Sequence, residues 1–261
     1  AAIITVADPT VPAAPALAGL LDHLVERLGA DRVHYLLIGA AEGDVPAGVA
    51  ATVHLLPGPT AAERAGNLLT RMATGRLSLQ EALTRSGTVQ RALTDLLAEL
   101  DVDLEVYDSV RVGQYAPSAG SARRVCFLDE LASERYEAVL DAMRDQPEVE
   151  FHPLRRFTEQ VPGPLRRIVD LPVARRALLA FEQRSIRRSE ISAARRFDRC
   201  LVPDARAARL LAVRALVDPG AVVAVPQTTT AVAAAFDEAC GTATSTPDAG
   251  VPAAEGGSAA A

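Results

Sequence analysis

Short apolar runs rich in β-branched residues recur along the first half of the chain and alternate with longer stretches of helical periodicity. This alternation is typical of parallel strands joined by right-handed crossovers. The almost uninterrupted apolar run at Val33–Ile38 indicates a sheet covered on both faces. We therefore predict an α/β fold, a single Rossmann-like, doubly wound parallel sheet flanked by helices. The predicted strands of this half are Ile3–Val6, Val33–Ile38, Val53–Leu56, Leu104–Tyr107 and Arg124–Leu128.

Leucines spaced along one face predict an amphipathic helix over Ala16–Leu28, which ends at Gly29 because glycine readily adopts the left-handed conformation of a helix C-cap. The segment from Thr60 to Glu99 is also helical, with breaks at Gly75 and Gly87. The second half adds helices from Ser133 to about Met143, over Val173–Phe197 and over Ala205–Leu216, and strands at Cys200–Val202 and Val222–Val225.

With 261 residues, the chain has room for one sizeable core. We predict one domain over residues 1–230 and a flexible, low-complexity tail over residues 231–261, which contains too little apolar surface to order itself. No apolar stretch approaches the ~18–20 residues of a membrane span. The N-terminus lacks the layout of a signal peptide, because Ile3–Val6 is followed at once by Asp8 and Pro9. These features predict a cytoplasmic protein.

The candidate metal and nucleophile residues are scattered. Cys126, Cys200 and Cys240 match neither a disulfide framework nor a metal-ligand spacing, and the first two are interpreted as small buried hydrophobes. The histidines are also too widely spaced to predict a metal site: His23, His34, His54 and His152. The sequence contains no Walker loop, G-x-G-x-x-G turn or nucleophile elbow.

The basic residues are unevenly distributed. The net charge is −6 and every basic side chain is arginine, and the stretch from Arg155 to Arg209 carries fourteen arginines against six acidic residues. Such a stripe can bind phosphates, anionic lipid or nucleic acid, or it can be a solvated helix face. We expect the solvated face, no nucleic-acid partner and at most peripheral contact with a membrane.

Three segments and a short final run resemble consecutive landmarks in the N-terminal domain of family 4 glycosyltransferases of the GT-B fold. They are Asp108–Tyr115 (DSVRVGQY), Arg124–Tyr136 (RVCFLDELASERY), Glu190–Leu210 (EISAARRFDRCLVPDARAARL) and Val222–Pro226 (VVAVP). The resemblance covers roughly residues 3–226 and implies transfer of a sugar from a nucleotide-sugar substrate to a hydroxyl acceptor, without a metal or other cofactor. It also implies that the domain corresponding to this chain binds the acceptor.

The sequence departs from the family pattern at two places. The family has a Gly pair after its first strand, where the backbone approaches the donor diphosphate, but here Gly19 is the only glycine near the expected place of this donor-phosphate loop. The hand-over at Pro226 lacks the Asn-Gly turn, and we expect no second Rossmann-like domain after it. We therefore expect a split or truncated transferase, inactive as the isolated chain, whose partner is a donor-domain subunit or a second copy. The alternative is a non-catalytic module that stabilises or targets a partner protein.

The acceptor expected is a small molecule, lipid or protein, and the candidate site residues follow two predicted strands. Asp129 ends one strand and is the leading catalytic candidate, because a carboxylate there could orient an acceptor hydroxyl or stabilise positive charge on the sugar. The alternative is an N-cap for the helix that starts near Leu131. The candidate acceptor-binding residues are Asp108, Arg111, Gln114, Tyr115, Ser133, Arg135 and Tyr136. For Arg135 an exposed helix face is the competing interpretation, and Tyr115 could instead pack onto the sheet.

Glu182 and Glu190 have the E-x7-E spacing of the family's donor-domain glutamates. On a helix, however, side chains eight residues apart lie ~80° apart at ~3.6 residues per turn, and no Gly-rich turn precedes them. We therefore expect both glutamates to form ion pairs with neighbouring arginines on a solvated face.

Overall fold

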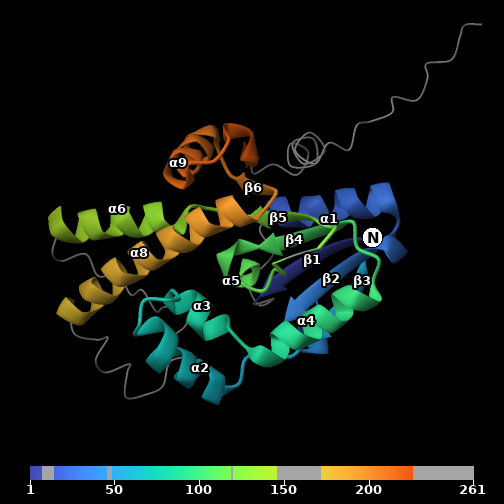
Figure 1. Cartoon of the computed structure of the whole chain (residues 1–261), viewed down its shortest axis with the longest axis horizontal. Helices are drawn as coiled ribbons and strands as arrows, with labels where there is room; N and C mark the ends of the chain where they lie inside the picture. The colour runs from blue at the N-terminus through green and yellow to red at the C-terminus, as the bar shows by residue number, and fades with distance from the viewer. Residues whose placement is uncertain (8–14, 46–48, 119, 146–171, 226–261) are drawn as a thin grey trace, which may run out of the picture.

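The computed structural model describes residues 1–7, 15–45, 49–118, 120–145 and 172–225. These residues form one seven-stranded parallel sheet with strand order β3-β2-β1-β4-β5-β6-β7 (Figure 1). The order reverses between β1 and β4, which is the hallmark of a doubly wound sheet. The predicted α/β class and every predicted strand are confirmed. The predicted tail over residues 231–261 and the hand-over at Pro226 lie outside the described residues.

The strands form where the sequence shows its apolar runs. All six residues of β2 are buried, as expected for a strand covered on both faces. The register places β1 between its two neighbours, because Ile4 lies opposite both Tyr35 of β2 and Val106 of β4. The strands are β1 (Ala2–Ala7), β2 (Val33–Ile38), β3 (Thr52–Leu56), β4 (Leu104–Asp108), β5 (Arg123–Phe127), β6 (Arg199–Val202) and β7 (Val222–Ala224).

Successive strand residues point to opposite faces and enter two hydrophobic cores. On one face, Ile4 and Val106 belong to the core that includes leucines of α1 (Pro15–Leu28). On the other face, Tyr107 belongs to the core that includes residues of α4 (Gly87–Glu99) and α8 (Pro172–Arg196). Helices therefore cover both faces of the sheet, as a doubly wound fold requires.

The remaining helices include a cluster between β3 and β4. There, Gly75 adopts a φ of +69°, and Gly87 is the first residue of α4, capped by the Ser86 hydroxyl, which accepts hydrogen bonds from the amides of residues 88 and 89. The predicted helix break at Gly75 is thus a left-handed turn, and the predicted break at Gly87 is the start of α4. The other helices are α2 (Ala61–Asn67), the π-helical turn η3 (Leu68–Met72), α3 (Leu79–Thr84), α5 (Ser109–Gly113), α6 (Ala132–Asp145) and α9 (Ala205–Ala215), with 3-10 turns η1 (Ala30–Arg32), η2 (Glu42–Asp44) and η5 (Pro219–Ala221).

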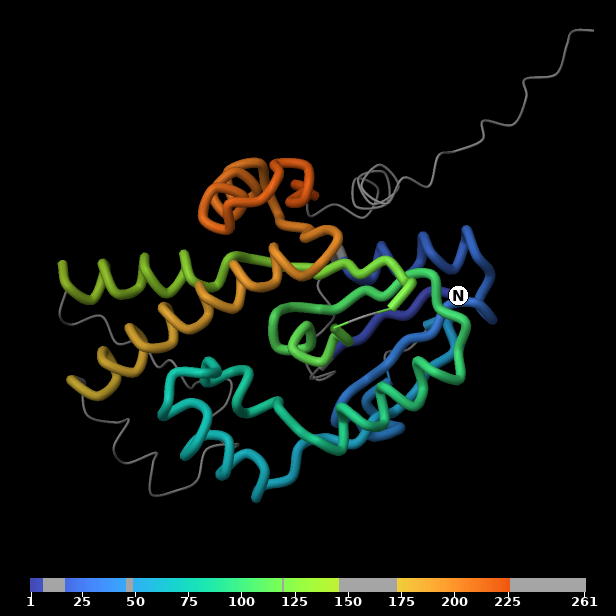
Figure 2. The backbone as a smooth tube through the Cα atoms, in the orientation of Figure 1, coloured from blue at the N-terminus to red at the C-terminus, as the bar shows by residue number. Residues whose placement is uncertain are grey.

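Helix α8 lies at the centre of the second half of the fold. It runs beside α6, which is joined to it through a small core of Tyr136, Leu179 and Ile186 (Figure 2). It also contacts α9, and elsewhere along its length it contacts α5 and the start of α3. Helix α8 therefore has two polar environments, one toward α6 and α9 and the other toward α3 and α5.

Two further expectations concern the cysteines and the bilayer. Cys126 of β5 and Cys200 of β6 are fully buried free thiols that lie opposite each other in the sheet register, which confirms their interpretation as small core residues. Among the helices that the structure describes, none is long and apolar enough to cross a membrane.

Candidate functional site

The candidate site is the carboxyl edge of the sheet at the point where the strand order reverses, where ligands of open α/β folds bind. Strand β4 ends at Asp108, which pairs in register with Phe127 of β5. Two residues beyond Phe127, Asp129 is exposed at the same edge. Strand β4 borders the switch point between β1 and β4, and β5 is its other neighbour, so the fold places Asp108 at the switch point and Asp129 one strand away along the same edge.

The charge of Asp129 acts on the carboxyl group of Asp108. Burial raises the pKa of Asp108 to about 6; the Arg111 guanidinium opposes this rise, and the negative charge of Asp129 adds to it. The predicted cluster of Asp108, Arg111 and Asp129 is therefore close enough to interact. A carboxyl group with a pKa near 6 can both accept and release a proton around neutral pH, which is the property of a general acid or base.

The turn between β4 and α5 is strained. Ser109 has a φ of +71°, in the left-handed region that non-glycine residues rarely adopt. Its hydroxyl accepts a hydrogen bond from Nε of Arg111 at 3.3 Å. Such a conformation costs on the order of 1 kcal/mol and, where it occurs, is often found at a functional site. Nothing in the residue pattern around Ser109 signals this strain.

Gln114 and Tyr115 form hydrogen bonds with residues in and just after α3. Tyr115 is 1% exposed, and its hydroxyl donates to the carbonyl of Thr84 and accepts from the amide of Ser86 at 2.8 Å. The amide of Gln114 donates to the Thr84 hydroxyl at 2.9 Å. Both side chains join the end of α5 to the segment around α3, which is the packing alternative for Tyr115, and contact with an acceptor stays a prediction.

The predicted residues of α6 are also engaged inside the protein. Ser133 is fully buried, and Tyr136 is 4% exposed and accepts a hydrogen bond from Nε2 of Gln80 at 2.7 Å. Arg135 is exposed, pairs with Glu130 at 2.6 Å and stacks its guanidinium 5.0 Å from the centroid of the Tyr136 ring. Ser133 and Tyr136 therefore take part in packing, and Arg135 lies on the exposed helix face that was its competing interpretation. Acceptor contact by these residues stays a prediction.

Gly19 does not lie in a phosphate-binding loop. It is buried within α1, which begins at Pro15. Only the first four amides of a helix lack a partner inside it, and Gly19 comes after them. The position of Gly19 inside α1 therefore gives no support to a donor-phosphate contact there, which stays a prediction. Residues 8–14, which contain the rest of that loop, lie outside the described residues.

The expectation for Glu182 and Glu190 is wrong. They are 2% and 3% exposed, and each accepts hydrogen bonds from the start of another helix. Glu182 accepts from the amides of residues 79 and 80 at the start of α3, and Glu190 accepts from the amide and hydroxyl of Ser133 at the start of α6. Burial raises the pKa of each carboxyl to about 7, and the hydrogen bonds from these donors oppose the rise.

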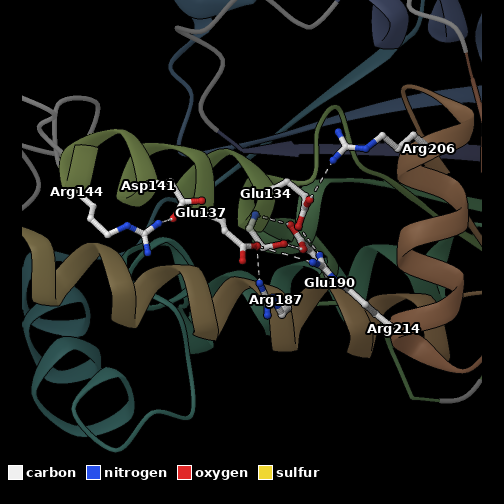
Figure 3. Close-up of polar contacts among 9 residues, drawn as sticks. Glu134, Glu137, Asp141, Arg144, Arg187, Glu190, Arg206 and Arg214 are labelled. Atoms are coloured by element: carbon white, nitrogen blue, oxygen red, sulfur yellow. Dashed lines mark hydrogen bonds and ion pairs between the residues drawn. The ribbon is translucent and has the colours of Figure 1, made fainter. Parts of the chain in front are cut away.

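Figure 3 shows Glu190 among the charged residues between α6, α8 and α9. Arg187 of α8 pairs with Glu137 of α6 at 2.7 Å, and Arg214 of α9 pairs with Glu134 of α6 at 2.6 Å. We call these four paired residues, with Glu190, the charged seam. The seam joins three helices and contains none of the candidate site residues, so its role is structural.

Two histidines that are far apart in the sequence meet on adjacent strands. Nδ1 of His34 in β2 lies 3.0 Å from Nε2 of His54 in β3. Burial lowers the pKa of both rings, and for His34 the neighbouring His54 lowers it further. Within the described ranges, no group of three or more His, Cys, Asp or Glu residues is arranged to hold a metal.

The sequence matches no protein-family profile and no curated protein. The structure is similar to the crystal structure of a UGT transferase from Siraitia grosvenorii in complex with UDP, with a TM-score of 0.44 and 19% sequence identity over 85% of this chain. The match covers 50% of that protein, so this chain spans about half its length. Because the TM-score is 0.44 and the sequence identity is 19%, this similarity supports no conclusion about function. The function is argued from the residues of this chain.

Proposed function

We propose that this chain forms the acceptor-binding side of a sugar-transfer enzyme that resembles family 4 glycosyltransferases. In this proposal it acts with a donor-binding unit, which holds a nucleotide-sugar on the opposite side of a cleft. The observation that carries the proposal is the pair of carboxylates, Asp108 and Asp129, at the carboxyl edge of the sheet beside its switch point, where the charge of Asp129 acts on Asp108. The strained turn at Ser109 supports it, because it lies directly beside Asp108.

Each carboxylate has a separate role in the proposed reaction. Asp129 is exposed, so it orients the acceptor hydroxyl or stabilises the positive charge that develops on the sugar ring. Asp108, with a pKa of about 6, accepts the proton of the hydroxyl as the new glycosidic bond forms and the nucleoside diphosphate leaves. Arg111 limits the pKa of Asp108, so that this carboxyl stays mostly ionised at neutral pH.

A second candidate function is a non-catalytic module that stabilises or targets a partner protein. The placement of Gly19 inside α1 favours it, because no glycine there offers a free amide to a diphosphate. The buried positions of Tyr115, Ser133 and Tyr136 favour it as well, because they leave fewer side chains for an acceptor.

The test is to co-purify the chain with its natural binding partners and to measure sugar transfer from labelled UDP-, GDP- and TDP-sugars. Transfer that requires both components, and that falls on the order of 10²-fold or more in a folded Asp129→Asn variant, supports the enzyme. The same assay with Asp141→Asn, an exposed aspartate of α6 away from the edge, is the control. Full activity of Asp129→Asn would remove this residue from the mechanism.

A further inference from the structure

A cavity of about 380 Å³ lies between α3, α5, α8 and the turn that follows η3. Its volume is within the range of about 300–1,000 Å³ that is typical of small-molecule sites. Five arginines contribute to its wall: Arg71, Arg76, Arg85, Arg188 and Arg196. Asp108 and Asp129 are not among its lining residues, so the cavity is separate from the carboxylate pair.

Among the residues that line the cavity, five arginines face a single carboxylate, that of Glu81. Within the described part of the chain, none of the five forms an ion pair, and Arg71 and Arg76 form no side-chain hydrogen bond either. The carboxylate in the wall is Glu81, which is 6% exposed and accepts hydrogen bonds from the amide of Ser78 at 3.0 Å and the hydroxyl of Ser189 at 2.7 Å. Burial lowers the pKa of Arg85, and the charges of Arg71 and Arg196 lower it further, whereas Tyr115 and Glu81 oppose the shift.

Two of the five guanidinium groups are held in fixed orientations. Nη1 of Arg85 donates to the carbonyl of Gln114 at 3.1 Å, and the group lies 5.4 Å from the centroid of the Tyr115 ring. Nη2 of Arg196 donates to the carbonyl of Gly113 at 2.9 Å, and that group lies over the Phe197 ring. Each group retains further N–H donors, because a guanidinium carries five. Fixed donors bind a ligand with a smaller loss of side-chain entropy.

The cavity wall also offers groups that suit a hydroxyl. Oε1 of Gln114 is buried without a hydrogen-bond partner within the described chain, and the hydroxyl-bearing residue Ser192 lies in the same wall. A buried amide oxygen without a donor is costly, and a ligand hydroxyl could satisfy it.

We propose that this cavity binds the phosphate or diphosphate group of a small phosphorylated hydroxyl compound. The guanidinium fork matches the oxygens of a phosphate, and an anion with more than one negative charge neutralises several arginines at once. The limited volume of the cavity, about 380 Å³, favours a compact ligand over a nucleic-acid strand, which requires an extended basic surface. This inference does not depend on the proposed sugar transfer, because it concerns binding by residues outside the carboxylate pair.

The test measures binding of inorganic phosphate and pyrophosphate to the full chain by calorimetry at physiological salt. We expect saturable binding, tighter for pyrophosphate. In the double variant Arg71→Gln/Arg188→Gln, binding should weaken on the order of 10²-fold, since each lost charge-assisted contact costs about tenfold. Both residues are exposed, so the variant should fold, and its thermal unfolding should match that of the unmodified chain.

The matched control is Arg91→Gln/Arg184→Gln, which removes the same charge from two exposed arginines outside the cavity wall. We expect its pyrophosphate affinity to stay within about twofold, because exposed charges are screened by salt. Equal weakening in both double variants would indicate general attraction to a basic surface and would overturn the proposal. No saturable binding of either phosphate or pyrophosphate would overturn it as well.

A third experiment distinguishes whether the bound phosphate belongs to a lipid headgroup or to a soluble phosphate ester. Vesicles of phosphatidylcholine containing phosphatidic acid are mixed with the chain, with and without pyrophosphate. Binding that pyrophosphate displaces, and that Arg71→Gln/Arg188→Gln abolishes, supports the proposal with a lipid headgroup as the source. Pyrophosphate binding without vesicle binding supports it with a soluble phosphate ester as the source.

Discussion

The two polar sides of α8 differ in how their charges are balanced. On the side that faces α6 and α9, the arginines of the charged seam have carboxylate partners within 4 Å, as Figure 3 shows for Arg187 and Arg214. On the side that faces α3 and α5, Arg188 and Arg196 line a cavity together with other arginines and have no such partner within the described chain. On α8, the arginine that faces α6 and α9 is therefore paired with a carboxylate, whereas the arginines that face the cavity form no ion pair within the described chain.

We infer from this difference that the two sides of α8 have different roles: the paired charges stabilise the fold, and the cavity arginines bind a ligand. Paired charges satisfy one another and join helices, whereas a group of like charges that face the same space repel and cost stability. A protein that retains such a group has a reason beyond folding, and a bound anion is the simplest one. The expectation of a wholly solvated basic face on α8 is therefore incomplete, because part of that face lines a cavity.

The largest expected effect is on the seam side, at Glu190. In Glu190→Ala, the amide and hydroxyl of Ser133 lose their acceptor and a small cavity opens, so we expect the free energy of unfolding to fall by about 2–4 kcal/mol. Urea denaturation measures the change. Glu190→Gln keeps an acceptor oxygen and should lose clearly less; equal losses in the two variants would contradict the capping role.

A smaller effect is expected in the pH dependence. The folded-state pKa of Glu182 is about 7, above the value of about 4.5 in the unfolded chain, so its contribution to stability is fully present below pH 4.5 and is lost as pH rises through 7. In Glu182→Gln this loss is absent. From pH 5 to pH 8, the stability of the variant relative to the unmodified chain should therefore rise, on the order of 1 kcal/mol or more. Parallel pH profiles of urea unfolding would contradict the raised pKa.

The smallest effects are expected when one arginine is substituted on each of the two sides of α8. Arg214→Gln leaves Glu134 without its partner at 2.6 Å, so we expect a loss of about 1 kcal/mol in the free energy of unfolding. Arg188→Gln removes a charge that repels its neighbours, so we expect a change within about 0.5 kcal/mol, in the stabilising direction. Thermal unfolding without added phosphate measures both. A larger loss for Arg188→Gln would show that the cavity arginines hold the fold.

The sequence by itself determined the sheet and much of its edge. Short apolar runs such as Val33–Ile38 must be buried wherever they occur in the chain. The number of strands and their order along the sequence can therefore be predicted from local sequence alone. The position of Asp129 directly after such a run also placed it at the carboxyl edge without knowledge of its neighbours. The predicted helices and their approximate ends followed from local periodicity in the same way.

Only the tertiary structure decided which polar residues are buried, strained or left without a partner. Glu182 looked like a solvated residue among arginines, yet its partners lie 102 and 103 positions earlier in the chain, beyond the reach of any helical spacing. The left-handed turn at Ser109 and the burial of Tyr115 depend in the same way on where neighbouring elements pack. The arginine cavity combines α3, α5 and α8, and its unbalanced charge exists only once these helices meet. Burial energies and Coulomb interactions depend on distance in space, which local sequence patterns do not specify.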